Sequence, residues 1–181
     1  MSYEGENKEQ GAKVKHPDFL LNTNYFILST QPRNPQHITR NTILTIARSQ
    51  IGIREATGNN DGQQVEAYLK VTNLPKGNPW CVAFISWVFA KAGYAQPRTA
   101  WSPSLFPIAK QTKIIRPAHV FGIYFKALKR IAHAGLVEEQ QGNWIVTIEG
   151  NTNVSGSREG DGVYRKRRHV KTIKVYANWL R

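Results

Sequence analysis

A strongly apolar segment that contains the only cysteine of the chain is the feature that most constrains the fold. It covers residues 81–90 and comes shortly after Pro79. Proline does not fit inside a helix and glycine is a common helix stop, so Pro79 and Gly93 predict a helix that begins beside Cys81. Its apolar side chains occur almost all round the helix, and we therefore expect it to be buried at the centre of a domain.

The position of Cys81 at the start of this helix has two interpretations. The first turn of a helix has unpaired N–H groups and the positive end of the helix dipole, and both favour a thiolate over a thiol. Cysteine is also among the most buried residue types and often serves as a small apolar side chain. The helix alone does not decide whether Cys81 is a nucleophile or a core residue. The rest of the sequence must distinguish the two.

Length and charge set the class of protein. The 181 residues suffice for one domain with an extension. We expect residues 1–37, which are mostly polar, to be an N-terminal extension, and residues 38–181 to form the domain. Lys and Arg number 25 against 12 Asp and Glu, a net charge of +13, which attracts polyanions such as nucleic acid, anionic lipid or wall polymers.

The N-terminus lacks the basic start and apolar run of a secretory signal. The longest apolar run is also too short to cross a bilayer. We therefore expect a soluble protein that reaches any site outside the cell by a route other than ordinary export.

Two further helices are expected before the cysteine helix. Apolar residues recur at helical spacing from Thr39 until Gly52. The polar segment 58–62 predicts a turn in which Asp61 caps a second helix. This turn also resembles a calcium loop, but the alternating oxygen ligands of such loops are missing, which favours a plain turn.

The second half of the chain has the pattern of short β-strands. Residues 94–111 predict irregular chain with short helical turns, in which Trp101 either anchors a loop to the core or lines a substrate groove. The expected strands follow at residues 120–125, 131–138, 144–149, 163–170 and 172–176. Helices followed by strands predict an α+β domain, with the helices packed on one face of an antiparallel sheet.

Two of these strands are joined by the segment 140–142, which has the length and the glycine of a three-residue hairpin loop. Pairing Glu139 with Asn143 across this loop places three residue pairs opposite one another: Val137 with Ile145, Gly135 with Thr147, and His133 with Glu149. Residues opposite each other in an antiparallel pair point to the same face. The sequence therefore predicts that His133 and Glu149 are neighbours, with Asn151 further along that face.

A histidine held by a carboxylate is the partner that a nucleophilic cysteine needs. The imidazole takes the thiol proton, and the carboxylate fixes the tautomer and orientation of the ring. Each of Cys81, His133 and Glu149 has a structural interpretation when taken alone, but together they favour catalysis. The other four histidines lack such a partner in the sequence, and one cysteine with scattered histidines does not predict a zinc site, so we expect no metal or cofactor.

The chain resembles the cysteine, histidine-dependent amidohydrolase/peptidase (CHAP) domains, relatives of the NlpC/P60 group with a papain-like core. The resemblance covers residues 41–176 and depends on five motifs in this order: Gly58-Asn59-Asn60-Asp61-Gly62, Pro79-Trp80-Cys81-Val82-Ala83-Phe84, His133-Ala134-Gly135-Leu136-Val137, Ile148-Glu149-Gly150-Asn151-Thr152, and Gly162-Val163-Tyr164-Arg165. The chain departs from the family at residues 117–120, where relatives usually have a Gly-Asp turn.

The resemblance implies hydrolysis of an amide bond in bacterial peptidoglycan, either within the peptides or between sugar and peptide. Cys81 would be the nucleophile at the N-terminus of the central helix, and His133 the base. Glu149 would orient the imidazole, and Asn151 would polarise it or hold the Glu149 loop. We expect a monomer that acts in the periplasm or cell wall as a phage lysin, a remodelling enzyme, or a secreted toxin with an immunity partner.

Two alternatives from other functional classes stay open at this point. The run at residues 163–171 has aromatic and basic residues on a strand, as some single-strand nucleic-acid binders do, but it lacks an accompanying recognition motif. This basic face would also suit an anionic wall or membrane surface. A second alternative is a non-catalytic domain that only binds wall peptide, against which the presence of Cys81, His133 and Glu149 argues.

Overall fold

The computed structural model describes residues 35–180 of the chain, so nearly all of the predicted N-terminal extension lies outside the described residues. It has three α-helices, α1 (Pro35–Arg48), α2 (Gln63–Lys70) and α3 (Cys81–Lys91), and six strands: β1 (Gln111–Thr112), β2 (Val120–Phe125), β3 (Arg130–Gln141), β4 (Trp144–Thr152), β5 (Gly162–His169) and β6 (Val175–Ala177). All strand pairs are antiparallel, in the order β1-β6-β2-β3-β4-β5. The predicted α+β class is confirmed.

Most of the predicted elements are present, with changes at the ends of the sheet. Four of the five predicted strands correspond to β2, β3, β4 and β5. The predicted strand at residues 172–176 is wrong in its first half, because Val170–Thr172 form a 3-10 turn and β6 begins only at Val175. Strand β1 has two residues, too few to show an alternating pattern in the sequence.

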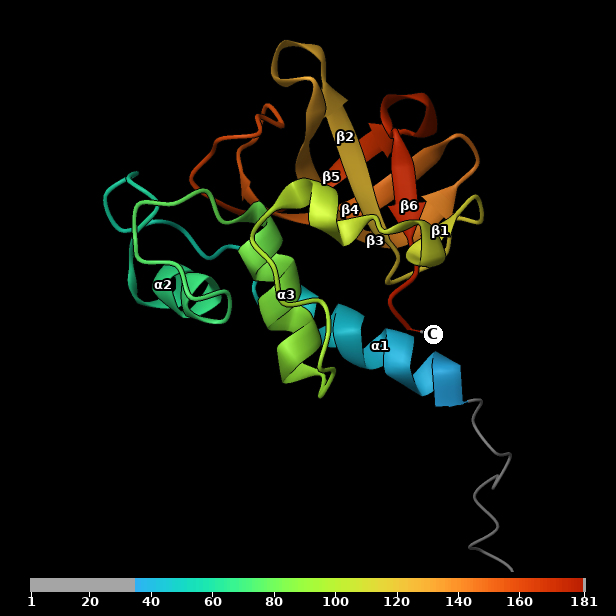
Figure 1. The fold of residues 1–181 in the computed structure, drawn as a ribbon, viewed down its shortest axis with the longest axis horizontal. Coiled ribbons are helices and arrows are strands. Elements are labelled where there is room, and N and C mark those ends of the chain that lie inside the picture. The colour runs from blue at the N-terminus through green and yellow to red at the C-terminus, as the bar shows by residue number, and fades with distance from the viewer. Residues whose placement is uncertain (1–34, 181) are drawn as a thin grey trace, which may run out of the picture. The chain divides into compact units, whose positions relative to one another are not determined.

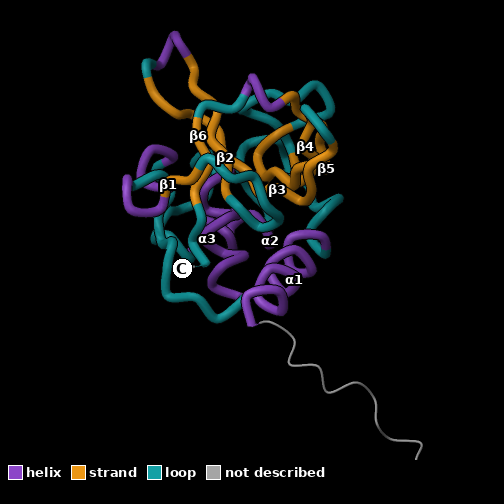
Figure 2. The backbone as a smooth tube through the Cα atoms, turned by 90° about the vertical axis from the view of Figure 1, so that its right-hand side faces the viewer, coloured by secondary structure: helices purple, strands orange, loops and turns teal. Residues whose placement is uncertain are grey.

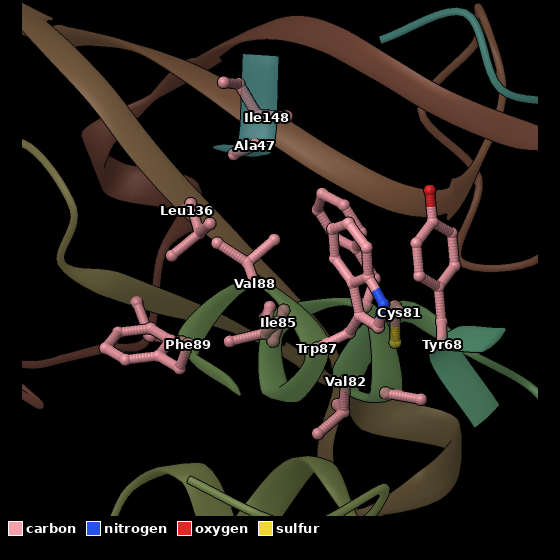
Figure 3. Packing of buried hydrophobic residues seen from close by; sticks show 14 of the residues in the cluster. Ala47, Tyr68, Cys81, Val82, Ile85, Trp87, Val88, Phe89, Leu136 and Ile148 are labelled. Carbon is pink, nitrogen blue, oxygen red and sulfur yellow. The ribbon is translucent and has the colours of Figure 1, made fainter. Parts of the chain in front are cut away.

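The three helices lie on one side of the sheet, as Figures 1 and 2 show from two directions. Helix α3 lies against β3 and β4, and both α1 and α2 pack against α3. Figure 3 shows Val88 of α3 close to Leu136 of β3 within this layer, and both side chains are fully buried. The cysteine helix is therefore the central element of the core, as its apolar sequence predicts.

Two glycines let α3 end and approach the sheet closely. Gly93, with φ of 85°, lies in the left-handed region just beyond the helix, where glycine has no steric cost. At Gly150 on β4, a Cβ atom would lie 2.7 Å from the Trp80 ring and 2.9 Å from the Cβ atom of Phe84. The start of α3 therefore packs directly on the β4 backbone.

The polar turn before α2 differs from the prediction. Gly62, with φ of 105°, is the residue before the helix and makes no side-chain cap. The Asp61 carboxylate instead accepts hydrogen bonds from the N–H and hydroxyl groups of Thr57, at 2.9 and 2.7 Å. The prediction that Asp61 caps α2 is therefore wrong, because its side chain closes the turn that precedes the helix.

A bulge in β3 ties the helical layer to the edge of the sheet. Between Val137 and Glu139 the pairing with β4 shifts, so Glu138 has no partner on β4. The Glu138 carboxylate is nearly buried and binds Arg48 of α1 at 2.6 Å and Arg165 of β5 at 2.6 and 2.9 Å. This one carboxylate therefore connects the first helix to the edge strand.

Residues of β2, β3 and β4 that point away from the helices form a second, smaller apolar cluster with β6. Its buried members are Phe121, Val137, Ile145 and Tyr176. The sheet is thus covered by apolar side chains on both faces. Within residues 35–180, no helix has the length and apolar character that crossing a membrane requires.

Candidate active site

Cys81 is the first residue of α3, as the sequence predicts. Its side chain is 5 % exposed and lines a pocket of about 330 Å³. The N-cap residue, Trp80, makes no side-chain cap to the helix. The positive end of the helix dipole is therefore not offset by a capping side chain and favours a negative charge at Cys81.

His133 on β3 and Glu149 on β4 form a buried hydrogen-bonded pair, with 2.8 Å between His133 Nε2 and Glu149 Oε2. The prediction that they are neighbours is confirmed, but the predicted register is wrong. Thr147 pairs with Val137 instead of Gly135. On the inner side of the bulge this displacement of two residues keeps the side chains on their predicted face, so His133 and Glu149 become diagonal neighbours.

The register differs because the hairpin turn is tighter than predicted. Gln141 pairs with Trp144, which leaves a loop of only Gly142 and Asn143. Gly142 has φ of 58°, the conformation that two-residue hairpin loops require. The bulge at Glu138 then offsets part of the displacement before the strands reach the site.

Gly135 provides the space in which Glu149 reaches His133. A Cβ atom at Gly135 would lie 2.7 Å from Glu149 Cγ and 2.8 Å from the Phe121 ring. Neither neighbour can move away, because both are fully buried. A glycine between His133 and the bulge is therefore a steric requirement of the site.

The Glu149 carboxylate has two partners besides His133. Arg168 of β5 donates to both of its oxygens at 2.6 Å, and the Thr147 hydroxyl donates to Oε1 at 2.6 Å. This paired geometry is the strong form of an arginine–carboxylate contact. Glu149 is therefore fixed in place by β5 as well as by its own strand.

These contacts determine the ionisation of Glu149 and His133. Burial opposes the charge on Glu149, but hydrogen bonds from Arg168 and His133 outweigh it and lower its pKa to about 2. Burial likewise disfavours a charged His133, yet its interactions with Cys81 and Glu149 raise its pKa to about 9. His133 is therefore protonated at neutral pH, and its Nε2–H group donates to the Glu149 carboxylate.

Cys81 is the acidic partner of His133. Burial alone would raise the pKa of the thiol, but His133 and the backbone N–H groups of Ala134 and Val82 lower it. Because Nε2 of the ring is bound to Glu149, Nδ1 is the nitrogen left to exchange a proton with Cys81. Nδ1 is buried and has no hydrogen-bond partner among residues 35–180. The pair thus favours a thiolate beside an imidazolium, the reactive form of a cysteine nucleophile.

Asn151 lies at the site but bonds to a different group than predicted. Its Oδ1 accepts a hydrogen bond from the N–H of Trp80 at 3.0 Å. Its Nδ2 donates to Asn60 Oδ1 and to the carbonyl of Gly160, both at 3.0 Å. Asn151 therefore holds the chain immediately before Cys81, and within the described part of the chain it makes no hydrogen bond to His133.

The pocket beside Cys81 also includes Trp101. The Trp101 side chain is 53 % exposed and lines this pocket, so it does not anchor its loop in the core. Of the two interpretations that the sequence allows, the structure supports the groove-lining one. Leu74, Pro79, Ala100 and Ala132 add apolar surface to the same pocket.

Neither His119 nor His169 joins this site. His119 is buried and its Nδ1 lies 2.9 Å from the carbonyl of Ile114. His169 Nδ1 accepts a hydrogen bond from the N–H of Lys171. His16 lies outside the described residues. Across residues 35–180, no group of three His, Cys, Asp or Glu side chains is arranged to hold a metal ion.

Arg168 is the main site residue that the sequence did not identify. The sequence suggested an outward basic run at residues 163–171, but Arg165 and Arg168 bind the buried carboxylates of Glu138 and Glu149. No local pattern in the run distinguishes Arg168 from its neighbours, so selecting it required the pairing of β5 with β4.

The chemistry of the site must be judged from these residues and contacts. Comparison of the chain with protein-family models, with curated proteins and with solved structures found no match in any of the three.

Proposed function

We propose that the protein is a cysteine-dependent amide hydrolase of the CHAP and NlpC/P60 type, with a papain-like core. Its substrate would be an amide bond of bacterial peptidoglycan, within the peptides or between sugar and peptide. The observation that carries the proposal is the arrangement of Cys81 at a helix N-terminus beside a His133 ring that Glu149 holds from the other side.

The proposed reaction is acyl transfer through a thioester. The Cys81 thiolate attacks the amide carbonyl carbon, and His133 gives its Nδ1 proton to the leaving amine as the C–N bond breaks. A water molecule then loses a proton to His133 and attacks the thioester carbonyl. The C–S bond breaks, the product carboxylic acid leaves, and the thiolate and imidazolium are restored.

The helix start supplies the remaining requirement, a place for the negative oxygen of the tetrahedral intermediate. N–H groups in the first turn of α3 have no partner within the helix, and we assign them to this oxygen. The N–H of Trp80 is excluded from this role because it already donates to Asn151. Asn151 thereby helps to position the turn that presents the other donors.

The contacts of the basic run favour this proposal over nucleic-acid binding. Arg165 and Arg168 are paired with carboxylates inside the protein, and Lys166 donates to the carbonyls of Asn153 and Val154. Three of the basic groups that suggested a polyanion partner are therefore used within the fold. We propose that the remaining positive charge keeps the enzyme near an anionic wall or membrane surface.

The test is mass spectrometry of purified peptidoglycan digested with the wild-type protein and, in parallel, with Cys81→Ala. We expect peptide fragments from the wild type alone, and their masses identify the bond. The circular dichroism spectra of the two proteins should coincide, because a thiol-to-methyl change removes little of the core. Equal release by both proteins, or none by a folded wild type, contradicts the proposal.

A further inference from the structure

The pocket at Cys81 has a distinct charge. Two of its lining residues are arginines, Arg130 and Arg158, and none is acidic. Apart from Cys81, its other lining residues are uncharged, so its positive charge comes from the two guanidinium groups. A pocket of this composition attracts an anionic group toward the nucleophile.

Arg130 is held in a fixed position at the edge of this pocket. Its guanidinium carbon lies 4.2 Å from the centre of the exposed Trp101 ring, and one nitrogen donates to the carbonyl of Ile131 at 3.0 Å. Stacking on tryptophan orients the plane of the guanidinium. Arg130 also begins the strand that carries His133, so its place relative to the reacting atoms is set by β3.

Arg130 has no acidic partner among the residues that the structure describes. The carboxylates near the site are already bound by other arginines: Glu149 by Arg168, and Glu138 by Arg48 and Arg165. Arg158 reaches the pocket from the loop between β4 and β5 and pairs with the exposed Glu159. Arg130 is therefore the cation of the pocket that is available to a ligand.

The positive surface continues beyond Arg130. A second hollow of about 370 Å³ shares Arg130 and adds Lys174, and a third of about 540 Å³ is lined by Lys174 and Lys113. Neither includes an acidic residue. The hollow that Asn151 lines, by contrast, is also lined by Glu55, Glu159 and Asp161. An acidic chain bound at Cys81 would therefore extend toward Lys174.

We propose that Arg130 binds a free carboxylate next to the scissile amide, so that the enzyme selects acidic peptides. A guanidinium binds a carboxylate through two parallel hydrogen bonds, which an uncharged amide cannot reproduce. A γ-glutamyl peptide has this chemistry, because its α-carboxylate stays free beside the chain. The inference rests on the proposed hydrolase function only for the position of the scissile bond, since binding of the carboxylate needs no turnover.

The test uses two synthetic peptides that differ in one group. The first is L-alanyl-γ-D-glutamyl-L-lysine with a free α-carboxylate, and the second has an α-carboxamide at the same position. Binding is measured by calorimetry on Cys81→Ala, and cleavage as kcat/KM on the wild-type chain. We expect a preference of about tenfold or more for the carboxylate peptide, which corresponds to about 1.4 kcal/mol.

Three substitutions, each made in the wild-type and Cys81→Ala backgrounds, locate the source of that preference. Arg130→Gln should bring the ratio between the two peptides close to one, and Arg130→Lys should leave an intermediate ratio because the paired geometry is lost. Lys70→Gln removes the same charge from an exposed position on α2 that does not line the pocket, and should leave the ratio unchanged.

The outcomes separate this inference from the proposed function. Equal or absent binding of the two peptides overturns the carboxylate site, and so does a preference that survives Arg130→Gln. A binding preference that depends on Arg130, without cleavage of either peptide, supports the carboxylate site and counts against the hydrolase proposal.

Discussion

Replacing Arg168 by glutamine should destabilise the protein by about 3 kcal/mol at pH 7. Glu149 is fully buried, and its hydrogen bonds from Arg168 and His133 lower its pKa from 4.5 to about 2. Each pKa unit corresponds to about 1.4 kcal/mol, so these partners stabilise the folded state by about 3 kcal/mol. Removing one partner of a buried ion pair costs a similar amount, about 3 to 5 kcal/mol.

The effect should depend on pH in a defined direction. The pKa of Glu149 is lowered on folding, so its stabilisation is fully present above pH 4.5 and is lost as the pH falls toward 2. The difference in stability between the wild type and Arg168→Gln should therefore be largest at neutral pH. It should shrink as both proteins are taken to about pH 3.

The assay is urea unfolding followed by tryptophan fluorescence, with Arg167→Gln as the matched control. Arg167 lies on the same strand and is exposed, with its guanidinium 4.7 Å from the Trp144 ring, so its loss should cost less than about 1 kcal/mol. The double change of Arg168→Gln with Glu149→Gln should recover part of the loss, because no buried charge is left without its partner.

A cost for Arg168→Gln no larger than that for Arg167→Gln would show that Arg168 does not keep Glu149 ionised. A difference between the wild type and Arg168→Gln that grows as the pH falls would refute the same reasoning. Both results can be obtained without any substrate, so they test the geometry of the site independently of its function.

Two further predictions concern the rate and the role of Asn151. The rate of peptide hydrolysis should rise with pH as the Cys81 thiolate forms, which happens below the usual thiol pKa of 9. It should fall again as His133 loses its proton near pH 9. A rate that still rises well above pH 9 contradicts this prediction. In Asn151→Gly the new glycine suits the φ of 53° at this position, but the buried N–H of Trp80 is left unpaired. Urea unfolding should therefore show a loss of about 1 to 3 kcal/mol in the free energy of unfolding. NMR titration should find the pKa of His133 unchanged, whereas a clear drop would mean that Asn151 acts on the ring.

The parts of the fold that follow from local chemistry could be read from the sequence. Pro79 and Gly93 marked the limits of the cysteine helix, and alternating apolar residues marked the longer strands. The pairing of His133 with Glu149 was predicted for a related reason. Strand alternation has a period of two residues, so even a register error of two left both side chains on the same face.

The remaining features depend on contacts between distant segments. Nothing near Arg168 in the sequence distinguishes it from Arg167, since only the pairing of β5 with β4 decides which of them meets Glu149. The partners of Glu138 at the bulge likewise depend on the positions of Arg48 on α1 and Arg165 on β5. The bond between Asn151 and Trp80 joins residues 71 positions apart, and no local pattern reports it.

The bulge at Glu138 also bears on which insertions and deletions the β3–β4 hairpin can tolerate. It separates the hairpin into an outer part near Gly142 and an inner part that carries His133 and Glu149. A single-residue deletion between the bulge and His133 would exchange the two faces of one inner strand relative to the other, and so separate His133 from Glu149. A change in the length of the turn alters the strand pairing only in the outer part, as long as the ion pairs of Glu138 hold. Homologous chains should therefore vary in hairpin length beyond this residue and keep the spacing from it to His133 constant.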